Sequence, residues 1–517
     1  MPQVGSIRLT TLDTNFEELT IDGLRAALLK RELTATELVD RYLARIEAHN
    51  DAGAEIHAVV TVNPQARADA AARDEFLNVT GTLSGPLHGI PVLVKDQAET
   101  AGLRTTFGSI LFAHYVPASD ATVITRLKDA GAIVLAKTAM CDFGAGWFSS
   151  SSITGHTKNP YDPGRDSGGS SAGTAAGVAA NFGLVGIGED TGGSIRIPAS
   201  YNNVFGLRVT PGLISRSGFS PLVHFQDTPG PIARTVSDLA QLLDSIVGHD
   251  PNDPLTATAS AIPGTGRHAR AIDSDLPFAS WRVGVLETGF GADRNPDAAP
   301  VNRVMRRAIA HLEELGVPTT PGVKIDGLSS WIAETSVYAK QAKSDITRFL
   351  VSRPSSPVSS FMAIYDSKRF HPHNDLFHKI AAGPDTTDDD AEYLRLRRNQ
   401  ERFRRLLLNV FASREVDFLV YPTVQVIPPT REELAAGKYR SSSFPTNTVI
   451  ASHAGLPALT IPVGFTEHGL PVGMELLGPP LAEGKMLQFA HACERSTRPR
   501  RRPELCRFIP TDAVGAG

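Results

Sequence analysis

The sequence has few cysteines and almost no net charge, and both absences exclude classes of protein. Only three cysteines occur among the 517 residues, at Cys141, Cys493 and Cys506. Such an odd and sparse set is not typical of a disulfide framework, so we expect a reducing compartment. The formal net charge is −4 at pH 7. It gives no electrostatic reason to expect nucleic acid or an anionic membrane surface as a partner.

Long hydrophobic runs and targeting patterns are also missing. No stretch reaches the roughly eighteen consecutive apolar residues that predict a membrane-spanning helix. Residues 1–14 lack a positively charged start followed by an apolar segment, so they predict no secretory signal. Hydrophobic residues make up 41% and charged residues 21% of the chain, which is ordinary for a globular enzyme. We therefore expect a cytoplasmic protein with no membrane partner and no nucleic-acid partner.

Hydrophobic patterns along the chain predict an α/β protein. Thr34 and Glu37 form a capping box inside a helical pattern that covers residues 21–49. Short apolar runs bounded by turn residues predict strands at residues 90–94, 132–136, 281–286, 418–421 and 458–463. Helical spacing predicts helices at residues 121–130, 173–180, 301–315 and 392–412. The alternation of strand and helix indicates a sheet covered by helices.

Serine and glycine dominate residues 149–194, but this segment does not have the composition of a linker. Apolar residues such as Ile187 and charged residues such as Glu189 interrupt it, whereas a flexible Gly/Ser linker contains neither. We infer a folded site at which the backbone passes close to a ligand.

The end of this segment has the features of an oxyanion site. Four successive backbone N–H groups stand beside the Ser194 hydroxyl, and such a nest can hold a developing negative charge. Asp190 and Arg196 flank the turn and can lock it with a charge-assisted ion pair, so we expect them to be structural supports. The four residues of the predicted nest are Thr191, Gly192, Gly193 and Ser194.

The motifs around these glycines resemble the amidase signature family. The stretch Gly168-Gly169-Ser170-Ser171 and the stretch Gly192-Gly193-Ser194-Ile195-Arg196-Ile197-Pro198 match the two ends of the family pattern, at the family spacing. Lys95, at the end of the apolar run 90–94, is similar to the family's strand-terminal lysine. The similarity covers nearly the whole chain except about residues 251–440.

The resemblance implies the amidase signature fold, a large mixed twisted β-sheet enclosed by α-helices. It implies one amidase domain over residues 1–517, with a core at 60–250 and 440–495. A variable helical region at about 280–440 is expected to shape the substrate entrance. The predicted substrate pocket draws on residues 141–148 and 222–226 as well as this region. Aromatic and apolar residues there favour an apolar substrate group, although core packing would explain them equally; they are Met140, Phe143, Trp147, Phe148 and Phe225.

The resemblance also implies a Ser-Ser-Lys triad. Ser194 is the expected nucleophile, and Ser170, which the family holds after a cis peptide bond, is expected to bridge it to a neutral Lys95. Ala139, Ala172 and Glu189 depart from the usual pattern, which leaves the triad intact but weakens any assignment to a subfamily.

Other candidate groups have less support from the sequence. Lys137 also ends an apolar run, but the family pattern gives it no role. Cys141 has no partner motif, which favours a buried structural thiol. The histidines show no metal-ligand spacing such as His-Glu-x-x-His, so no metal and no cofactor are expected. A nucleotide site is disfavoured because no Gly-Lys-Ser/Thr follows the glycines.

Two activities remain open at this level. The first is a free-standing amidase that hydrolyses a small-molecule amide, with side activity on esters. The second is a glutaminase-type subunit of an amidotransferase complex. Residues 216–226 lack an obvious additional set of charges for binding glutamine, which favours the first. A non-catalytic binding protein and a homodimer are further alternatives that the sequence leaves open.

Overall fold

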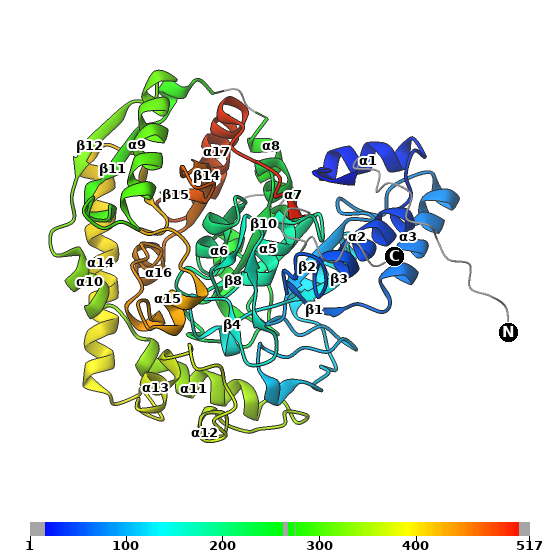
Figure 1. The fold of residues 1–517 in the computed structure, drawn as a ribbon, viewed down its shortest axis with the longest axis horizontal. Coiled ribbons are helices and arrows are strands. Elements are labelled where there is room, and N and C mark those ends of the chain that lie inside the picture. Colours follow the sequence, from blue (N-terminus) through cyan, green and yellow to red (C-terminus); the bar gives the residue numbers. More distant parts are fainter. Residues whose placement is uncertain (1–15, 262–266, 274–275, 506–517) are drawn as a thin grey trace.

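A computed structural model describes residues 16–261, 267–273 and 276–505 (Figure 1). Cys506 and residues 1–14, on which part of the sequence analysis relied, lie outside these ranges. The two other cysteines, Cys141 and Cys493, are free and buried. Within the described ranges, no helix combines the length and the apolar character needed to cross a bilayer.

The predicted large mixed sheet with enclosing helices is confirmed. The described residues contain an eleven-stranded sheet of order β1-β3-β2-β8-β10-β9-β14-β15-β13-β11-β12. Neighbouring strands pair both parallel, as β2 with β8, and antiparallel, as β8 with β10. The strands of this sheet are β1 (Val59–Val62), β2 (Pro91–Lys95), β3 (Ile133–Thr138), β8 (Val185–Asp190), β9 (Phe205–Arg208), β10 (Thr228–Ala233), β11 (Val283–Leu286), β12 (Thr319–Val323), β13 (Phe418–Pro422), β14 (Ala458–Phe465) and β15 (Pro471–Leu477).

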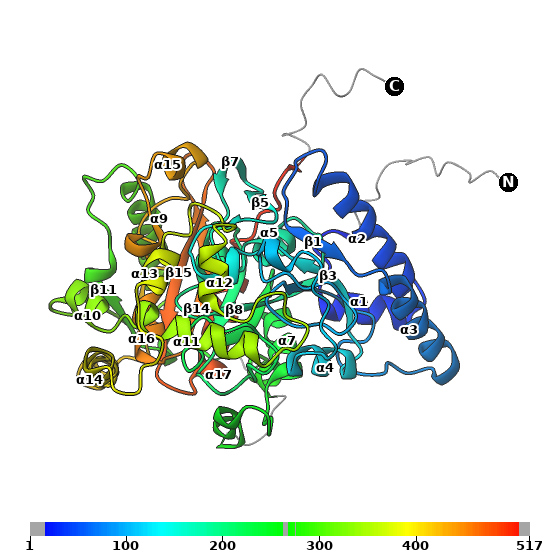
Figure 2. The same cartoon turned by 90° about the horizontal axis from the view of Figure 1, so that it is seen from below.

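Four short strands form two small ribbons beside the sheet: β4 (Ser150–Ser151) with β5 (Gly155–His156), and β6 (Lys158–Asn159) with β7 (Asp162–Asp166). Helices surround the sheet (Figures 1 and 2). They are α1 (Ile21–Leu29), α2 (Ala35–His49), α3 (Ala66–Thr80), α4 (Thr122–Asp129), α5 (Ala172–Ala179), α6 (Arg196–Tyr201), α7 (Val236–Ile246), α8 (His268–Ala271), α9 (Ala299–Glu314), α10 (Leu328–Glu334), α11 (Tyr338–Val351), α12 (Phe361–Asp366), α13 (Leu376–Ala381), α14 (Ala391–Arg414), α15 (Arg431–Ala435), α16 (Val449–Ala454) and α17 (Glu483–Thr497).

The helical pattern over residues 21–49 forms two helices, α1 and α2. Thr34 is the N-cap of α2, and its side chain accepts from the Glu37 N–H in the predicted capping box. An N-cap residue has extended backbone angles, which interrupts the helical run before it. Arg31, with φ of 60°, lies in the turn that separates the two helices.

The segment at about 280–440 contributes strands as well as helices. β11, β12 and β13 come from it and form one edge of the sheet. In Figure 1, α10 and α14 of the same segment lie at the left of the molecule, and α11, α12 and α13 lie along its bottom. This segment is therefore continuous with the core sheet.

The carboxyl ends of two neighbouring interior strands bring chemically active residues close together. β2 and β8 are parallel neighbours, paired at Val94 and Ile187, so their carboxyl ends meet. β2 ends at Lys95, and β8 ends at Glu189 and Asp190.

A glycine at the start of α5 allows this helix to approach the sheet closely. Gly173 donates its N–H to the Ala139 carbonyl at 2.9 Å, and a Cβ on Gly173 would collide with backbone atoms of Ala58 and Ala139. We expect Gly173→Ala to lower the free energy of unfolding by about 1–3 kcal/mol through overpacking, measured by urea denaturation. Gly484→Ala is the matched control, because Gly484 also lies near a helix start but has open space around its Cβ position. An unchanged midpoint in Gly173→Ala would contradict this account.

Candidate active site

Lys95, the last residue of β2, is in direct contact with Ser170. The Lys95 Nζ donates to Ser170 Oγ at 2.8 Å, and both residues are fully buried. The Gly169–Ser170 peptide bond is cis. Ser171, the N-cap of α5, donates its backbone N–H to the Ser194 carbonyl at 3.0 Å. The segment that carries Ser170 therefore runs against the segment that carries Ser194.

Glu189, one of the departures from the family pattern, is the second partner of Lys95. The Lys95 Nζ lies 3.1 Å from the Glu189 carbonyl oxygen and 3.4 Å from its carboxylate oxygen Oε2. Thr191 Oγ1 lies 3.2 Å from the other carboxylate oxygen and donates to Asp227 at 2.6 Å. Burial raises the pKa of Glu189 well above its usual range, although the charge of Lys95 opposes this rise.

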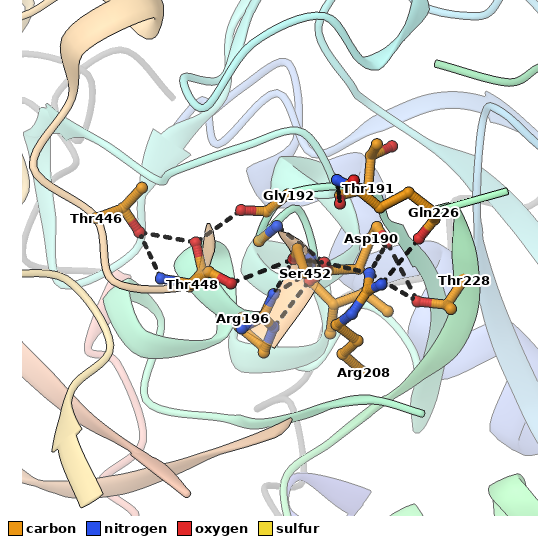
Figure 3. Close-up of polar contacts among 12 residues, drawn as sticks. Asp190, Thr191, Gly192, Arg196, Arg208, Gln226, Thr228, Thr446, Thr448 and Ser452 are labelled. Carbon is orange, nitrogen blue, oxygen red and sulfur yellow. Dashed lines mark hydrogen bonds and ion pairs between the residues drawn. The ribbon is translucent and has the colours of Figure 1, made fainter. Parts of the chain in front are cut away.

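Asp190 is the centre of a buried ionic network (Figure 3). Its carboxylate accepts from Arg196 Nη2 at 3.0 Å and from Arg208 Nη1 at 3.1 Å. Arg196 also pairs with Glu475 and donates to Ser452 Oγ at 2.8 Å. Burial opposes the charge on Asp190, but the two arginines outweigh it and hold the pKa of this carboxyl well below its usual range. The predicted pair of Asp190 and Arg196 is thus present within a larger cluster.

Each carbonyl group of the turn at 190–193 accepts at least one hydrogen bond. Arg208 and Thr228 donate to the Asp190 carbonyl, and Gln226 Nε2 donates to that of Thr191 at 2.6 Å. Thr448 Oγ1 donates to the Gly192 carbonyl at 2.8 Å, and the Ile197 N–H donates to that of Gly193 at 2.8 Å. In a trans peptide the N–H of the next residue points opposite to the carbonyl. These contacts, most of them drawn in Figure 3, therefore orient the N–H groups of residues 191–194.

One of the four predicted oxyanion donors is already engaged. The Gly193 N–H donates to Asp190 Oδ1 at 2.8 Å. No protein acceptor is found within the described ranges for the N–H groups of Thr191, Gly192 and Ser194. Gly193 has φ of 132°, a conformation that favours glycine, and a Cβ there would collide with the Thr448 side chain. The turn thus leaves three free donors beside the Ser194 hydroxyl.

Ser194 lies on the wall of a cavity of about 500 Å³. Its lining includes Trp147, Gly192, Leu222, Tyr338, Lys379 and Phe444. Among the described residues that line it, none is an aspartate or a glutamate. The described lining therefore combines aromatic and aliphatic side chains with several serines, and Lys379 is its one lysine or arginine.

The predicted pocket residues divide between this cavity and other places. Trp147 and Leu222 line the cavity. Phe143 and Phe148 are core residues instead, with exposed fractions of 0% and 3%. Phe225 lies elsewhere, with the Arg397 guanidinium 3.5 Å from its ring centroid.

The two less supported groups have structural partners. Lys137 is buried, donates to Thr105 Oγ1 at 3.0 Å and lies 3.4 Å from an Asp96 carboxylate oxygen. Its salt bridge with Asp96 satisfies the buried charge of the lysine. Burial raises the pKa of the Cys141 thiol, and a high pKa makes a nucleophilic thiolate scarce. The expectation of a buried thiol is confirmed.

Several residues of the site were not identified from the sequence. Arg208 and Glu475 are single charges inside otherwise apolar strands, and a charge in a buried strand requires a partner. That pattern could have indicated both. Tyr338 and Thr448 contact the turn from distant segments: the Tyr338 ring would block a Cβ on Gly192, as the Thr448 side chain does on Gly193. No local sequence signal distinguishes these two residues.

Comparison with known proteins identifies relatives that match almost the whole chain. A family model described as amidase matches residues 37–487. A glutamyl-tRNA(Gln) amidotransferase subunit of Moorella thermoacetica is 34% identical over 497 residues, covering 94% of this chain and 98% of that relative. The native peptide amidase from Stenotrophomonas maltophilia is 32% identical with a TM-score of 0.82, covering 95% of this chain and 99% of that chain. The corresponding glutamyl-tRNA(Gln) amidotransferase subunit from Thermotoga maritima is 27% identical with a TM-score of 0.73, covering 95% and 99%.

The ionic network predicts a large stability loss on removing its central charge. Asp190→Asn leaves two buried arginines without their shared partner, and we expect the free energy of unfolding to fall by about 3–5 kcal/mol. Glu401→Gln is the control, because Glu401 pairs with Arg405 on an exposed helix surface at 2.9 Å, where such pairs contribute about 0.5 kcal/mol or less. Urea denaturation of both variants measures the difference. Similar losses in the two variants would show that Asp190 is not the centre of the network.

Proposed function

The chain belongs to the amidase family and is an amide-hydrolysing enzyme, and from this premise we propose that it is a free-standing amidase that forms an acyl-enzyme on Ser194. The observation that carries the proposal is the 2.8 Å contact between the buried Lys95 Nζ and Ser170 Oγ. Ser194, the proposed nucleophile, lines the cavity. Its expected substrates are small or peptide carboxamides.

The proposed reaction runs in two halves. Ser194 Oγ attacks the amide carbonyl carbon while its proton passes to Ser170, whose own proton passes to neutral Lys95. The proton then returns through Ser170 to the amide nitrogen, which leaves as ammonia or an amine. Water next attacks the acyl-enzyme by the same relay, and the carboxylic acid is released. Lys95 thus acts first as a base and then as an acid.

Backbone donors are proposed to stabilise the tetrahedral intermediates. Within the described part of the chain, the N–H groups of Thr191, Gly192 and Ser194 have no protein acceptor. They are oriented by hydrogen bonds to the carbonyls of Asp190, Thr191 and Gly193. Preorganised donors of this kind need no reorientation as the oxyanion forms. Asp190 and Arg196 hold the turn without contacting the substrate, and in this proposal the Gly193 N–H serves to anchor the turn on Asp190.

Glu189 is proposed to adjust the protonation of Lys95. A carboxylate 3.4 Å from Nζ stabilises the ammonium form, which cannot accept a proton. Burial raises the pKa of Glu189. The raised pKa favours the neutral carboxyl group, which stabilises the ammonium form of the lysine less than a carboxylate does. Asp190 and Asp227 both lie near Glu189 and add to the rise. The pair can therefore hold one proton between a carboxylic acid and a neutral amine.

The cavity favours an amide with an apolar body. Free glutamine carries both an α-ammonium and an α-carboxylate, and buried charges need partners. Lys379 is the only lysine or arginine among the described lining residues, and no lining carboxylate is available for an ammonium group. The aromatic rings of Trp147 and Tyr338, 6.4 Å apart between centroids, suit an apolar or aromatic group.

A second candidate function is that of an amidotransferase subunit. The 34% identity to a glutamyl-tRNA(Gln) amidotransferase subunit over 98% of that relative supports it. Ammonia release measured on the purified chain alone distinguishes the two. Turnover of apolar carboxamides in preference to glutamine would support the free-standing amidase. Turnover of glutamine only after a partner is added would support the role in a complex.

A fluorophosphonate probe tests the activated serine. We expect intact-mass spectrometry to show one adduct on the wild-type chain and none on Ser194→Ala. Lys95→Met should slow labelling by about 100-fold or more, since it removes the base. Ser413→Ala, which changes an exposed serine on α14, is the control and should label like the wild type. No adduct on folded wild-type protein would exclude the proposed mechanism.

The role of Glu189 predicts a shift in the pH dependence of hydrolysis. Glu189→Gln replaces a buried carboxyl group with a raised pKa by an amide that cannot ionise beside the Lys95 Nζ. We expect the acid limb of the kcat/KM profile to move to lower pH by about one unit or more. Glu401→Gln, on the exposed face of α14, should leave the profile in place. A shift toward higher pH, or none, would show that Glu189 does not hold a proton on Lys95.

A further inference from the structure

Three histidines from distant parts of the chain meet outside the active site. His156 ends β5, while His371 and His373 lie in the loop between α12 and α13. One nitrogen from each ring lies within 4.8 Å of the other two. The ring centroids are 4.8 Å apart for His371 and His373, and 5.0 Å and 5.4 Å from His156 to these two. We refer to these residues as the three-histidine cluster.

Each ring of the cluster can offer one ligand atom to a metal. All three residues are half-buried, and their nitrogens meet without an intervening side chain of the cluster. A neutral imidazole offers one nitrogen lone pair, which is the group that ligates a metal.

Ser150 supplies the type of outer contact that orients metal-binding histidines. It stands opposite His156 in the β4–β5 pair, and its Oγ lies 3.0 Å from Nδ1 of His156 and 3.0 Å from Nδ1 of His373. A hydroxyl oxygen can accept from both Nδ1–H groups, which leaves both Nε2 lone pairs free. His371 accepts the His373 N–H on its Nδ1 at 3.2 Å.

We propose that His156, His371 and His373 form a binding site for a divalent transition metal, with Zn²⁺ the ion that suits three imidazoles. Zinc binds histidine nitrogen at about 2.0–2.1 Å with tetrahedral geometry and accepts water as a fourth ligand. Ligand nitrogens in such a site lie roughly 3.3 Å apart, so the three rings must move together by small rotations. Mg²⁺ prefers oxygen ligands and is disfavoured here.

The surrounding charges are compatible with a bound cation. Arg431 is close enough to His156 to disfavour its protonation, but it also donates to the Pro163 carbonyl at 2.8 Å. Asp142 accepts from Asn374 Nδ2 at 2.8 Å in the same loop, and Asp375 lies near His373. Two carboxyl groups and one arginine therefore lie near the three-histidine cluster.

A bound metal would join the core to the wall of the active-site cavity. The β4–β5 pair belongs to the segment before Ser170, whereas the loop with His371 and His373 leads into α13. Leu376 and Lys379 of α13 line the cavity. Asp375, next to them, accepts the Ser441 N–H at 2.9 Å. The site is therefore structural in this proposal, and it does not depend on the proposed reaction.

Calorimetric titration of the full chain with Zn²⁺ tests the proposal, after removal of any tag and treatment with a chelator. We expect about one bound Zn²⁺ per chain, a rise in Tm on binding, and no binding of Mg²⁺. Substituting Co²⁺ should give the visible absorption of a tetrahedral site. A double variant, His156→Asn with His373→Asn, should lose binding and the rise in Tm.

Two further variants make the result decisive. His378→Asn changes a histidine of α13 outside the three-histidine cluster and should bind Zn²⁺ like the wild type. Ser150→Ala keeps all three imidazoles and should weaken binding about tenfold through loss of the outer contact, which tests the site even if the double variant fails to fold. Absence of Zn²⁺ binding to the wild-type chain would overturn the proposal, and so would unchanged binding in Ser150→Ala or in a folded double variant.

Discussion

The geometry of the site depends on the contact between the Asp190 carboxylate and two buried arginines. Removing charges from water is unfavourable unless they are paired and hydrogen-bonded, and here Arg196 and Arg208 supply both. The same carboxylate accepts the N–H groups of Gly193 and Ile195. One ionic cluster thus holds both ends of the turn that presents Ser194. The turn keeps its geometry without a regular helix or strand because this cluster anchors it at Gly193 and Ile195.

Five of the eleven strands and the central residues could be predicted because their signals are local. Apolar runs that end on a charged residue predicted the strand that carries Lys95, and the two glycine-serine motifs predicted the segments of Ser170 and Ser194. Parallel pairing of β2 and β8 then brings these segments together. The split of residues 21–49 into two helices was missed, although the capping box at Thr34 marks the start of the second.

The remaining features depend on packing between distant segments, which no single motif encodes. Tyr338 reaches Gly192 from a helix more than a hundred positions away, and its ring gives no periodic signal. The three-histidine cluster joins a ribbon before Ser170 to a loop before α13, so its ligands do not share one helix face or one short motif. Phe143 and Phe148 illustrate the opposite case, because aromatic residues near a site are equally suited to the core.

Glu189 and Asp190, the last two residues of β8, both form buried ion pairs, but their cationic partners differ in whether they can lose a proton. Asp190 faces two arginines, which do not lose their protons, so its carboxylate stays ionised and the turn keeps one geometry. Glu189, one residue earlier, faces a lysine, which can give up its proton when buried. The two carboxyl groups are neighbours in the chain but have separate cationic partners. The end of β8 therefore carries one carboxylate, Asp190, that stays charged and holds the turn. It also carries Glu189, whose pairing with Lys95 allows a proton to be exchanged beside the proposed relay.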